Sequence, residues 1–212
     1  MLWIERLKDW HQERKFRRQR AQRGWSVKDT WEVDTWFLTV VPQMLEYLKE
    51  HHHGFPTEIQ REYLEAHRDE LGMTYEEFCI YPADENSEGY KLREKIDDIC
   101  DQRWEEILGR MVFLFREANR ETCTVQNPYK EENRRINREF TEKYGMFGEK
   151  LLKPEDISPD GSRKLYTPMC LPEYREAKER YLAEEEKIWQ YQDRCKTEAL
   201  DLFNKWFWSL WD

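Results

Sequence analysis

A central helix is predicted between residues 27 and 53, where apolar residues recur at helical spacing on two adjoining faces. The first face carries Trp31, Leu38, Val41, Leu45 and Leu48. The second face carries Val33, Trp36, Phe37, Val40, Met44 and Tyr47. A helix that is apolar nearly all round is covered by its neighbours, so this one is expected at the centre of the fold. Ser26 and Asp29 resemble a capping box and place the start of the helix at about Val27.

Two residues interrupt this pattern. Pro42 lacks a backbone donor and clashes with the carbonyl four residues earlier, which predicts a bend or a restart of the helix just before it. Asp34 falls between Trp31 and Leu38 on the face that is expected to be buried. A buried carboxylate needs a partner, because burying it alone costs several kcal/mol. Asp34 is therefore expected in a structural ion pair or cap, or alternatively in a ligand site.

Two further long helices complete the predicted core. Apolar residues repeat at helical spacing from Leu92 to about Asn119, and the MVFLF run near the end of this segment is expected to be buried. The last helix starts at Pro172, which suits a first helical turn, and continues to about Leu210. Its aromatic stripe widens toward the end. Trp206 and its neighbours must therefore dock into the core or onto another copy of the chain.

The weakly apolar stretch 121–171 separates these two helices. Residues 133–138 have the pattern of a polar helix, and the Pro- and Gly-containing run after them predicts an excursion over the surface. A small strand pair around Leu165 and Tyr166 is compatible with this run. The sequence thus predicts an all-α fold, a multi-helix bundle in one domain over residues 1–212. It has a central apolar helix and a long aromatic carboxy-terminal helix, with 121–171 as an irregular insertion.

Composition and charge narrow the class of protein. Ten tryptophans and an aromatic content of 15% indicate a folded chain despite 37% charged residues. The net charge of −9 argues against broad nucleic-acid binding, although residues 1–25 carry eight Lys or Arg against three acidic residues. Five widely spaced cysteines without a CxxC pair favour a reducing compartment. Without a signal peptide or a membrane-length apolar run, we expect a cytoplasmic protein with no membrane partner.

The basic segment before the central helix is the main candidate for a ligand site. Arginines grip phosphate and aromatic rings stack on bases, so these residues could form a pocket for an anionic nucleotide. The candidates are Arg17, Arg18, Arg20, Arg23, Trp25 and Asp34, joined by Arg134, Arg135 and Arg138 from a second segment or a second subunit. The alternative is a solvated helix end whose cations suit the carboxy-terminal dipole.

Three consecutive histidines, His51, His52 and His53, close the central helix. Neighbouring side chains point in different directions on a helix, so the three cannot all bind one ion. Neither a metal site nor a cofactor is predicted.

Three stretches of the chain carry a resemblance: RGWSVKDTWEVDTWFLTVVPQMLEYL, the following HHHGFP, and the carboxy-terminal EALDLFNKWFWSLWD. In these stretches the sequence resembles a family of uncharacterised tailed-bacteriophage proteins. That family pairs an RG(W/Y)S…D.W..D motif with a mid-chain tryptophan, here Trp104, and an aromatic LWD-like end. The resemblance implies a small phage protein in the cytoplasm of an infected bacterium. Phage accessory proteins of this size often interfere with host defence, by binding a defence protein or by sequestering a nucleotide signal.

The sequence favours binding over catalysis. It has no GxSxG, no HExxH and no phosphate-cradling glycine loop, and eight glycines leave little room for such loops. An acidic, aromatic-rich surface suits contact with another protein. We therefore expect a homo-oligomeric phage accessory protein that antagonises host antiphage defence by binding a host protein. The alternatives are a sponge that sequesters an anionic nucleotide immune signal and a phage structural or assembly factor.

Overall fold

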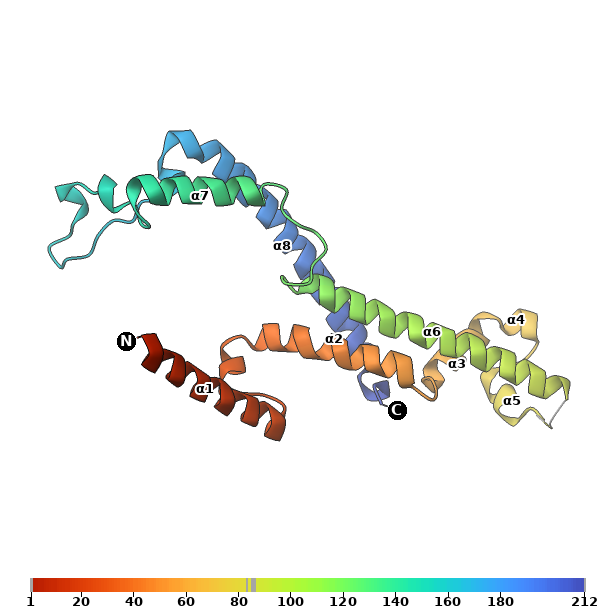
Figure 1. Cartoon of the computed structure of the whole chain (residues 1–212). Helices are drawn as coiled ribbons and strands as arrows, with labels where there is room; N and C mark the ends of the chain where they lie inside the picture. Colours follow the sequence, from red (N-terminus) through yellow and green to blue (C-terminus); the bar gives the residue numbers. More distant parts are fainter. Residues whose placement is uncertain (1, 83, 85–86, 212) are drawn as a thin grey trace. The chain divides into compact units, whose positions relative to one another are not determined.

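The computed structural model describes residues 2–82, 84 and 87–211, and the side chains of 10–82, 84 and 87–211. The described residues form eight α-helices joined by 3-10 helices, turns and loops (Figure 1). The predicted all-α class is therefore confirmed. The chain divides into two compact units, one made of Met1–Asn119 with Lys196–Asp212 and the other of Arg120–Cys195.

The core of the first unit is a helical bundle in which α2 (Val33–His51) packs along α6 (Glu88–Ala118) (Figure 1). The apolar residues of α6 repeat every three or four positions and form one buried stripe: Ile96, Cys100, Trp104, Leu108, Met111 and Phe115. The end of α8 (Pro172–Trp206) adds Trp206 to this core. The Trp104 and Trp206 rings meet edge to face, with centroids 5.6 Å apart. The predicted docking into the core is thus confirmed for Trp206, whereas the neighbouring rings of Phe207 and Trp208 are exposed.

Two elements precede α2 in the chain: α1 (Leu2–Arg23) and a short 3-10 helix, η1 (Val27–Trp31). The Asp29 carboxylate accepts the Ser26 N–H at 2.7 Å, as the capping-box pattern predicts. The central α-helix begins later than the predicted Val27, because η1 precedes it.

The step from η1 to α2 changes which side chains are buried. Glu32 lies between the two helices with φ −141° and ψ 64°, which breaks the helical phase. Trp31 is therefore 87% exposed, and Asp34 is exposed in the first turn of α2. The prediction of a buried Asp34 that needs a partner is wrong, because it assumed one uninterrupted helix from Val27.

The central helix continues through Pro42 and does not restart there. Proline has no N–H, so the Leu38 carbonyl loses the donor that would stand four residues later. The side-chain amide of Asn119, at the end of α6, donates to this carbonyl at 3.4 Å. A neighbouring helix thus supplies the missing donor.

Three short helices extend the first unit: α3 (Thr57–Ala66), α4 (Arg68–Leu71) and α5 (Tyr75–Ile80). The chain breaks at His67, which ends α3 and precedes α4. The buried side chains of Ile59 and Leu64 face the core. Arg93 of α6 donates to the Phe78 carbonyl at 2.9 Å, which ties α5 to α6.

The second unit is formed by α7 (Lys130–Tyr144), the first part of α8 and three 3-10 turns: η2 (Glu149–Leu151), η3 (Pro154–Asp156) and η4 (Pro168–Cys170). α7 is the predicted polar helix and buries only Ile136 and Phe140. Within the described residues the only β contact is an isolated antiparallel bridge between Ile157 and Arg163. The predicted strand pair around Leu165 and Tyr166 does not form.

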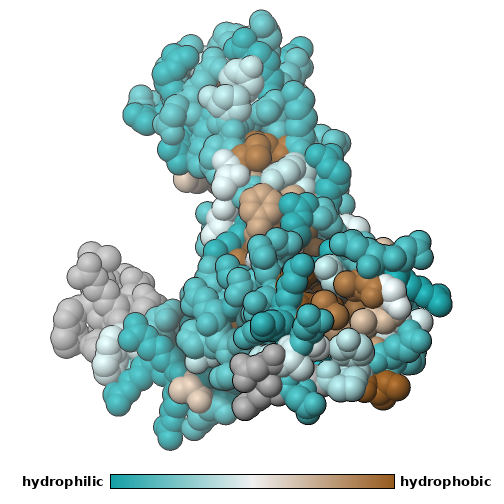
Figure 2. Space-filling model, turned by 90° about the vertical axis from the view of Figure 1, so that its right-hand side faces the viewer, coloured by the Kyte–Doolittle hydropathy of each residue, from teal (hydrophilic) through white to brown (hydrophobic). Residues whose placement is uncertain are grey.

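The surface is mainly hydrophilic on the face shown in Figure 2, with separate groups of hydrophobic residues. After α8 the chain forms a last 3-10 turn, η5 (Phe207–Ser209), whose rings contribute to the exposed apolar area. In the described part of the chain, no helix is long and apolar enough to cross a membrane.

Candidate functional site

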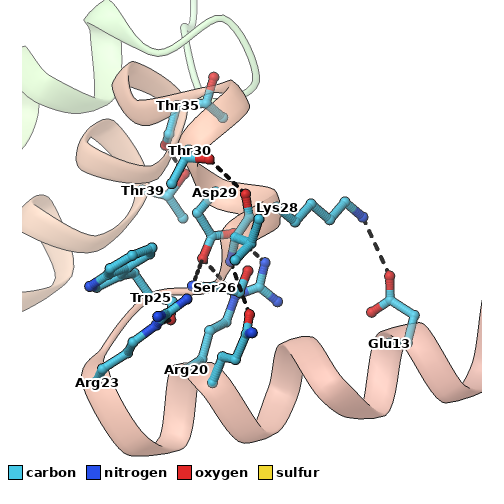
Figure 3. Close-up of polar contacts among 12 residues, drawn as sticks. Glu13, Arg20, Arg23, Trp25, Ser26, Lys28, Asp29, Thr30, Thr35 and Thr39 are labelled. Atoms are coloured by element: carbon cyan, nitrogen blue, oxygen red, sulfur yellow. Dashed lines mark hydrogen bonds and ion pairs between the residues drawn. The ribbon is translucent and has the colours of Figure 1, made fainter.

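The predicted amino-terminal site is organised by an ion pair between Arg20 of α1 and Asp29 of η1 (Figure 3). Arg20 Nε donates to Asp29 Oδ2 at 3.0 Å, and Arg20 Nη2 donates to the other carboxylate oxygen. The Arg20 guanidinium, followed by the Ser26 N–H, holds the pKa of Asp29 far below its usual range. The Arg20 guanidinium is therefore bound to a carboxylate of the protein itself, and a ligand would have to compete with Asp29 for it. The pair also fixes the turn between α1 and η1.

Arg23 and Trp25 form a second contact at this turn (Figure 3). The Arg23 guanidinium lies 3.6 Å from the centroid of the Trp25 ring, and its Nε donates to the Trp25 carbonyl at 3.1 Å. This is a cation–π pair, with Trp25 40% exposed. Arg17 and Arg18 are exposed on α1. One face of Trp25 is thus occupied, and a base could stack there only by displacing Arg23.

An open hollow of about 360 Å³ lies between α1, η1 and α2. Its polar lining carries both signs of charge, from Arg20 and Lys28 on one hand and Asp29 and Glu32 on the other. Trp36 and Val40 supply its apolar wall. Because its positive and negative charges balance, this hollow is expected to bind an anion only weakly.

The remaining candidate residues do not join the amino-terminal group. Arg134, Arg135 and Arg138 belong to α7 in the second unit, whereas Arg20 and its neighbours belong to the first. Arg134 pairs with Glu131 at 2.6 Å, and Arg135 pairs with Glu139 at 3.1 Å, both within α7. Arg138 is exposed, as is Asp34 in α2.

An apolar region that sequence analysis did not assign to a site lies at the carboxy terminus. We call it the carboxy-terminal aromatic surface and define it by Met44 and Tyr47 of α2 with Phe207, Trp208 and Trp211. Their exposed fractions range from 49% for Phe207 to 87% for Trp208. Only Trp206 of this aromatic run has a buried ring among the described residues after 203.

Two hollows open on this surface. The first, of about 420 Å³, has only apolar lining residues: Val41, Met44, Leu45, Leu48, Phe203, Phe207, Leu210 and Trp211. The second, of about 510 Å³, lies between the His53–Glu58 turn and the rings of Trp104, Trp208 and Trp211. Trp211 lines both hollows, so the two adjoin at its ring. The density of aromatic residues after 202 is the sequence signal that could have indicated an exposed surface.

A hollow of about 470 Å³ lies in the second unit. Arg120, Lys130, Glu185 and Glu186 line it together with Trp189, which is 60% exposed. Arg120 pairs with Glu185 at 3.3 Å. With charges of both signs and an internal ion pair, this hollow favours no particular ligand.

The fold and these surfaces define an all-helical protein with an apolar, aromatic contact surface. Comparison with protein-family models, with curated proteins and with solved structures finds no match for the chain.

Proposed function

We propose that this chain binds another protein through its carboxy-terminal aromatic surface and has no catalytic role. The observation that carries the proposal is the exposure of Trp208 and Trp211, at 87% and 73%, beside an entirely apolar hollow. Exposed apolar patches of this kind mark interaction sites, and Trp is the residue most enriched among binding hot spots. Each buried ring would remove about 150 to 250 Å² from water.

The partner is expected to present an apolar side chain within a basic surface. The hollow lined by Leu45, Phe203 and Leu210 offers a receptor for such a side chain, and the surrounding rings would exclude water from the contact. The net charge of −9 favours encounter with a positively charged protein.

The cellular setting of the proposal comes from the resemblance to tailed-phage proteins. We propose that the partner is a host protein of an antiphage defence system, which the chain antagonises in the cytoplasm of the infected bacterium. Binding alone is sufficient for this role, because occupying a functional surface of the partner inhibits it without chemistry.

The test compares three forms of the protein in infected cells: wild type, the double variant Trp208→Ala/Trp211→Ala, and Trp189→Ala. Trp189 is 60% exposed but belongs to the second unit, so it controls for loss of an exposed indole. A protein captured by wild type and Trp189→Ala is then purified and titrated by calorimetry. We expect the double variant to bind it at least about 30-fold more weakly, corresponding to one hot spot of roughly 2 kcal/mol. Equal affinity for all three forms would contradict the proposal.

Self-association is the competing use of the same surface, and light scattering separates the two. If the double variant changes the oligomeric order while a defined partner still binds it, the aromatic surface joins copies of this chain. Unchanged order with lost partner binding supports recognition of another protein.

A nucleotide-binding role rests on a different observation, the Arg23–Trp25 pair beside Arg17 and Arg18. It is less well supported, because Arg20 is bound to Asp29 and Trp25 is stacked on Arg23. Native mass spectrometry of protein purified from bacteria tests it. A bound mass of several hundred daltons that absorbs near 260 nm, lost in the triple variant Arg17→Ala/Arg18→Ala/Arg23→Ala, would make this role the leading one.

A further inference from the structure

We propose that His52, Asp101 and Glu105 bind a divalent transition-metal ion where α2 ends against α6. His52 directly follows α2 as its carboxy-terminal cap, and Asp101 and Glu105 stand one helical turn apart on α6. A separation of four residues places both carboxylates on the same face of the helix. One ligand atom from each of the three residues lies within 4.8 Å of the others.

The His52 ring is held in the orientation that a metal ligand requires. Its side chain is only 4% exposed, and its Nδ1 lies 2.9 Å from the Gly54 carbonyl oxygen. A carbonyl can only accept, so Nδ1 carries the proton in this contact and Nε2 retains its lone pair. Metal-binding histidines are commonly oriented by such a bond from the second ring nitrogen to a backbone carbonyl.

Both carboxylates lie beside the His52 ring, and side-chain rotations would complete the site. Glu105 Oε1 is 3.9 Å from His52 Nε2, and Asp101 Oδ1 is 3.5 Å from His52 Nδ1. Ligand atoms that share a tetrahedral ion at about 2.0 to 2.2 Å lie roughly 3.4 Å apart. Asp101 must turn further toward Nε2 than Glu105. Its side chain is 46% exposed, which leaves room for that rotation.

The donor set selects the class of ion. One imidazole nitrogen with two carboxylate oxygens suits Zn²⁺ and neighbouring divalent ions such as Co²⁺ and Mn²⁺. Ca²⁺ is disfavoured because its sites are built from oxygen ligands. Three protein ligands leave at least one position for water.

The ion would fix the turn that borders the carboxy-terminal aromatic surface. Gly54, which orients His52, also lines the hollow that contains Trp208 and Trp211. Binding would clamp the end of α2 to the middle of α6 and hold this turn in place. The metal site stands on its own geometry and does not depend on the proposed function.

Zinc titration of chelator-treated, tag-free protein, followed by calorimetry, tests the site. We expect one ion per chain, with affinity reduced by roughly 100-fold or more in His52→Ala and in Glu105→Gln, since loss of even an outer-shell partner costs about 10- to 100-fold. His51→Ala is the matched control, because His51 is exposed and stacks on Tyr47. We expect its affinity to equal that of wild type.

Two results would contradict the proposal that these residues bind a metal ion. One is the absence of saturable zinc binding in folded wild-type protein. The other is binding that survives in Glu105→Gln, a variant that keeps the size of the side chain. Because the chain has five cysteines, the absorption of the Co²⁺ form provides a separate readout. Thiolate-to-metal charge-transfer bands would place the ion at cysteine and reject the proposal.

Discussion

The side-chain amide of Asn119 donates to the backbone carbonyl of Leu38 at 3.4 Å. This carbonyl lacks its usual helical donor because Pro42 stands four residues later. Asn119 is only 5% exposed and ends α6, so the contact joins the two main helices of the first unit at the point where one of them lacks a hydrogen bond.

Replacing Asn119 by Ala should therefore be more costly while Pro42 is present. We expect Asn119→Ala to lower the free energy of unfolding by about 1 to 3 kcal/mol, the range for leaving a buried polar group without its partner. In a Pro42→Ala background, the new N–H can bond Leu38, and the same change should cost clearly less. Chemical denaturation of the four proteins gives the coupling energy. Additive costs would show that the Asn119 amide does not compensate for the proline.

Trp206 is expected to be the most sensitive position of the carboxy-terminal aromatic run. It is 3% exposed and packs edge to face on Trp104, so Trp206→Ala leaves a cavity in the core and should cost about 3 to 5 kcal/mol. Trp208→Ala is the matched control, since Trp208 is 87% exposed and should change stability by less than about 1 kcal/mol. Urea denaturation measures both. A loss below about 1 kcal/mol for Trp206→Ala would mean that the ring is not part of the core.

Substitution of two glycines in the second unit distinguishes the cost of backbone strain from the cost of steric clash. Gly148 and Gly161 have φ of +68° and +83°, which L side chains rarely adopt. A Cβ at Gly148 would lie 2.5 Å from the Cβ of Tyr166, whereas nothing lies within 4 Å of one at Gly161. We expect Gly161→Ala to cost about 1 to 2 kcal/mol, and Gly148→Ala to cost at least about 1 kcal/mol more. Hydrogen exchange of residues 145–168 measures the difference. Equal protection in both variants would contradict it.

The sequence predicted the fold more completely than the sites because helices are encoded locally. The spacing of apolar residues in α6 indicates the buried Trp104 directly, and Ser26 with Asp29 indicates the turn before α2. The exposure of Trp31 could not be predicted in this way, since the break at Glu32 changes the helical phase after η1.

The sites depend on contacts between residues that are distant in the chain. His52 and Glu105 are 53 positions apart and meet only because α2 packs along α6. Neither the row of three histidines nor the acidic residues of α6 distinguishes His52 from its neighbours. Likewise, the sequence of the basic segment reveals its arginines but does not reveal that Arg20 forms an ion pair with Asp29. Such pairings follow from the packing, which periodicity alone does not supply.

The Arg20–Asp29 pair should make the fold sensitive to acid. In the folded protein the pKa of Asp29 lies below the value of about 3.9 expected for an unfolded chain, chiefly because Arg20 bonds the ionised carboxylate. The ionised form therefore stabilises the fold fully at pH values above about 4, and this contribution is lost as the pH falls from there toward the folded pKa.

In Asp29→Asn, the contribution is absent at every pH. We therefore expect this variant to unfold at a lower temperature than wild type at pH 7, with the difference shrinking as the pH falls below about 4. Circular dichroism during heating measures both midpoints. Asp34→Asn is the control, because Asp34 is exposed and its loss should leave the pH profile unchanged. A constant difference between Asp29→Asn and wild type as the pH falls would show that Asp29 stabilises the turn through its shape and hydrogen bonding rather than through its charge.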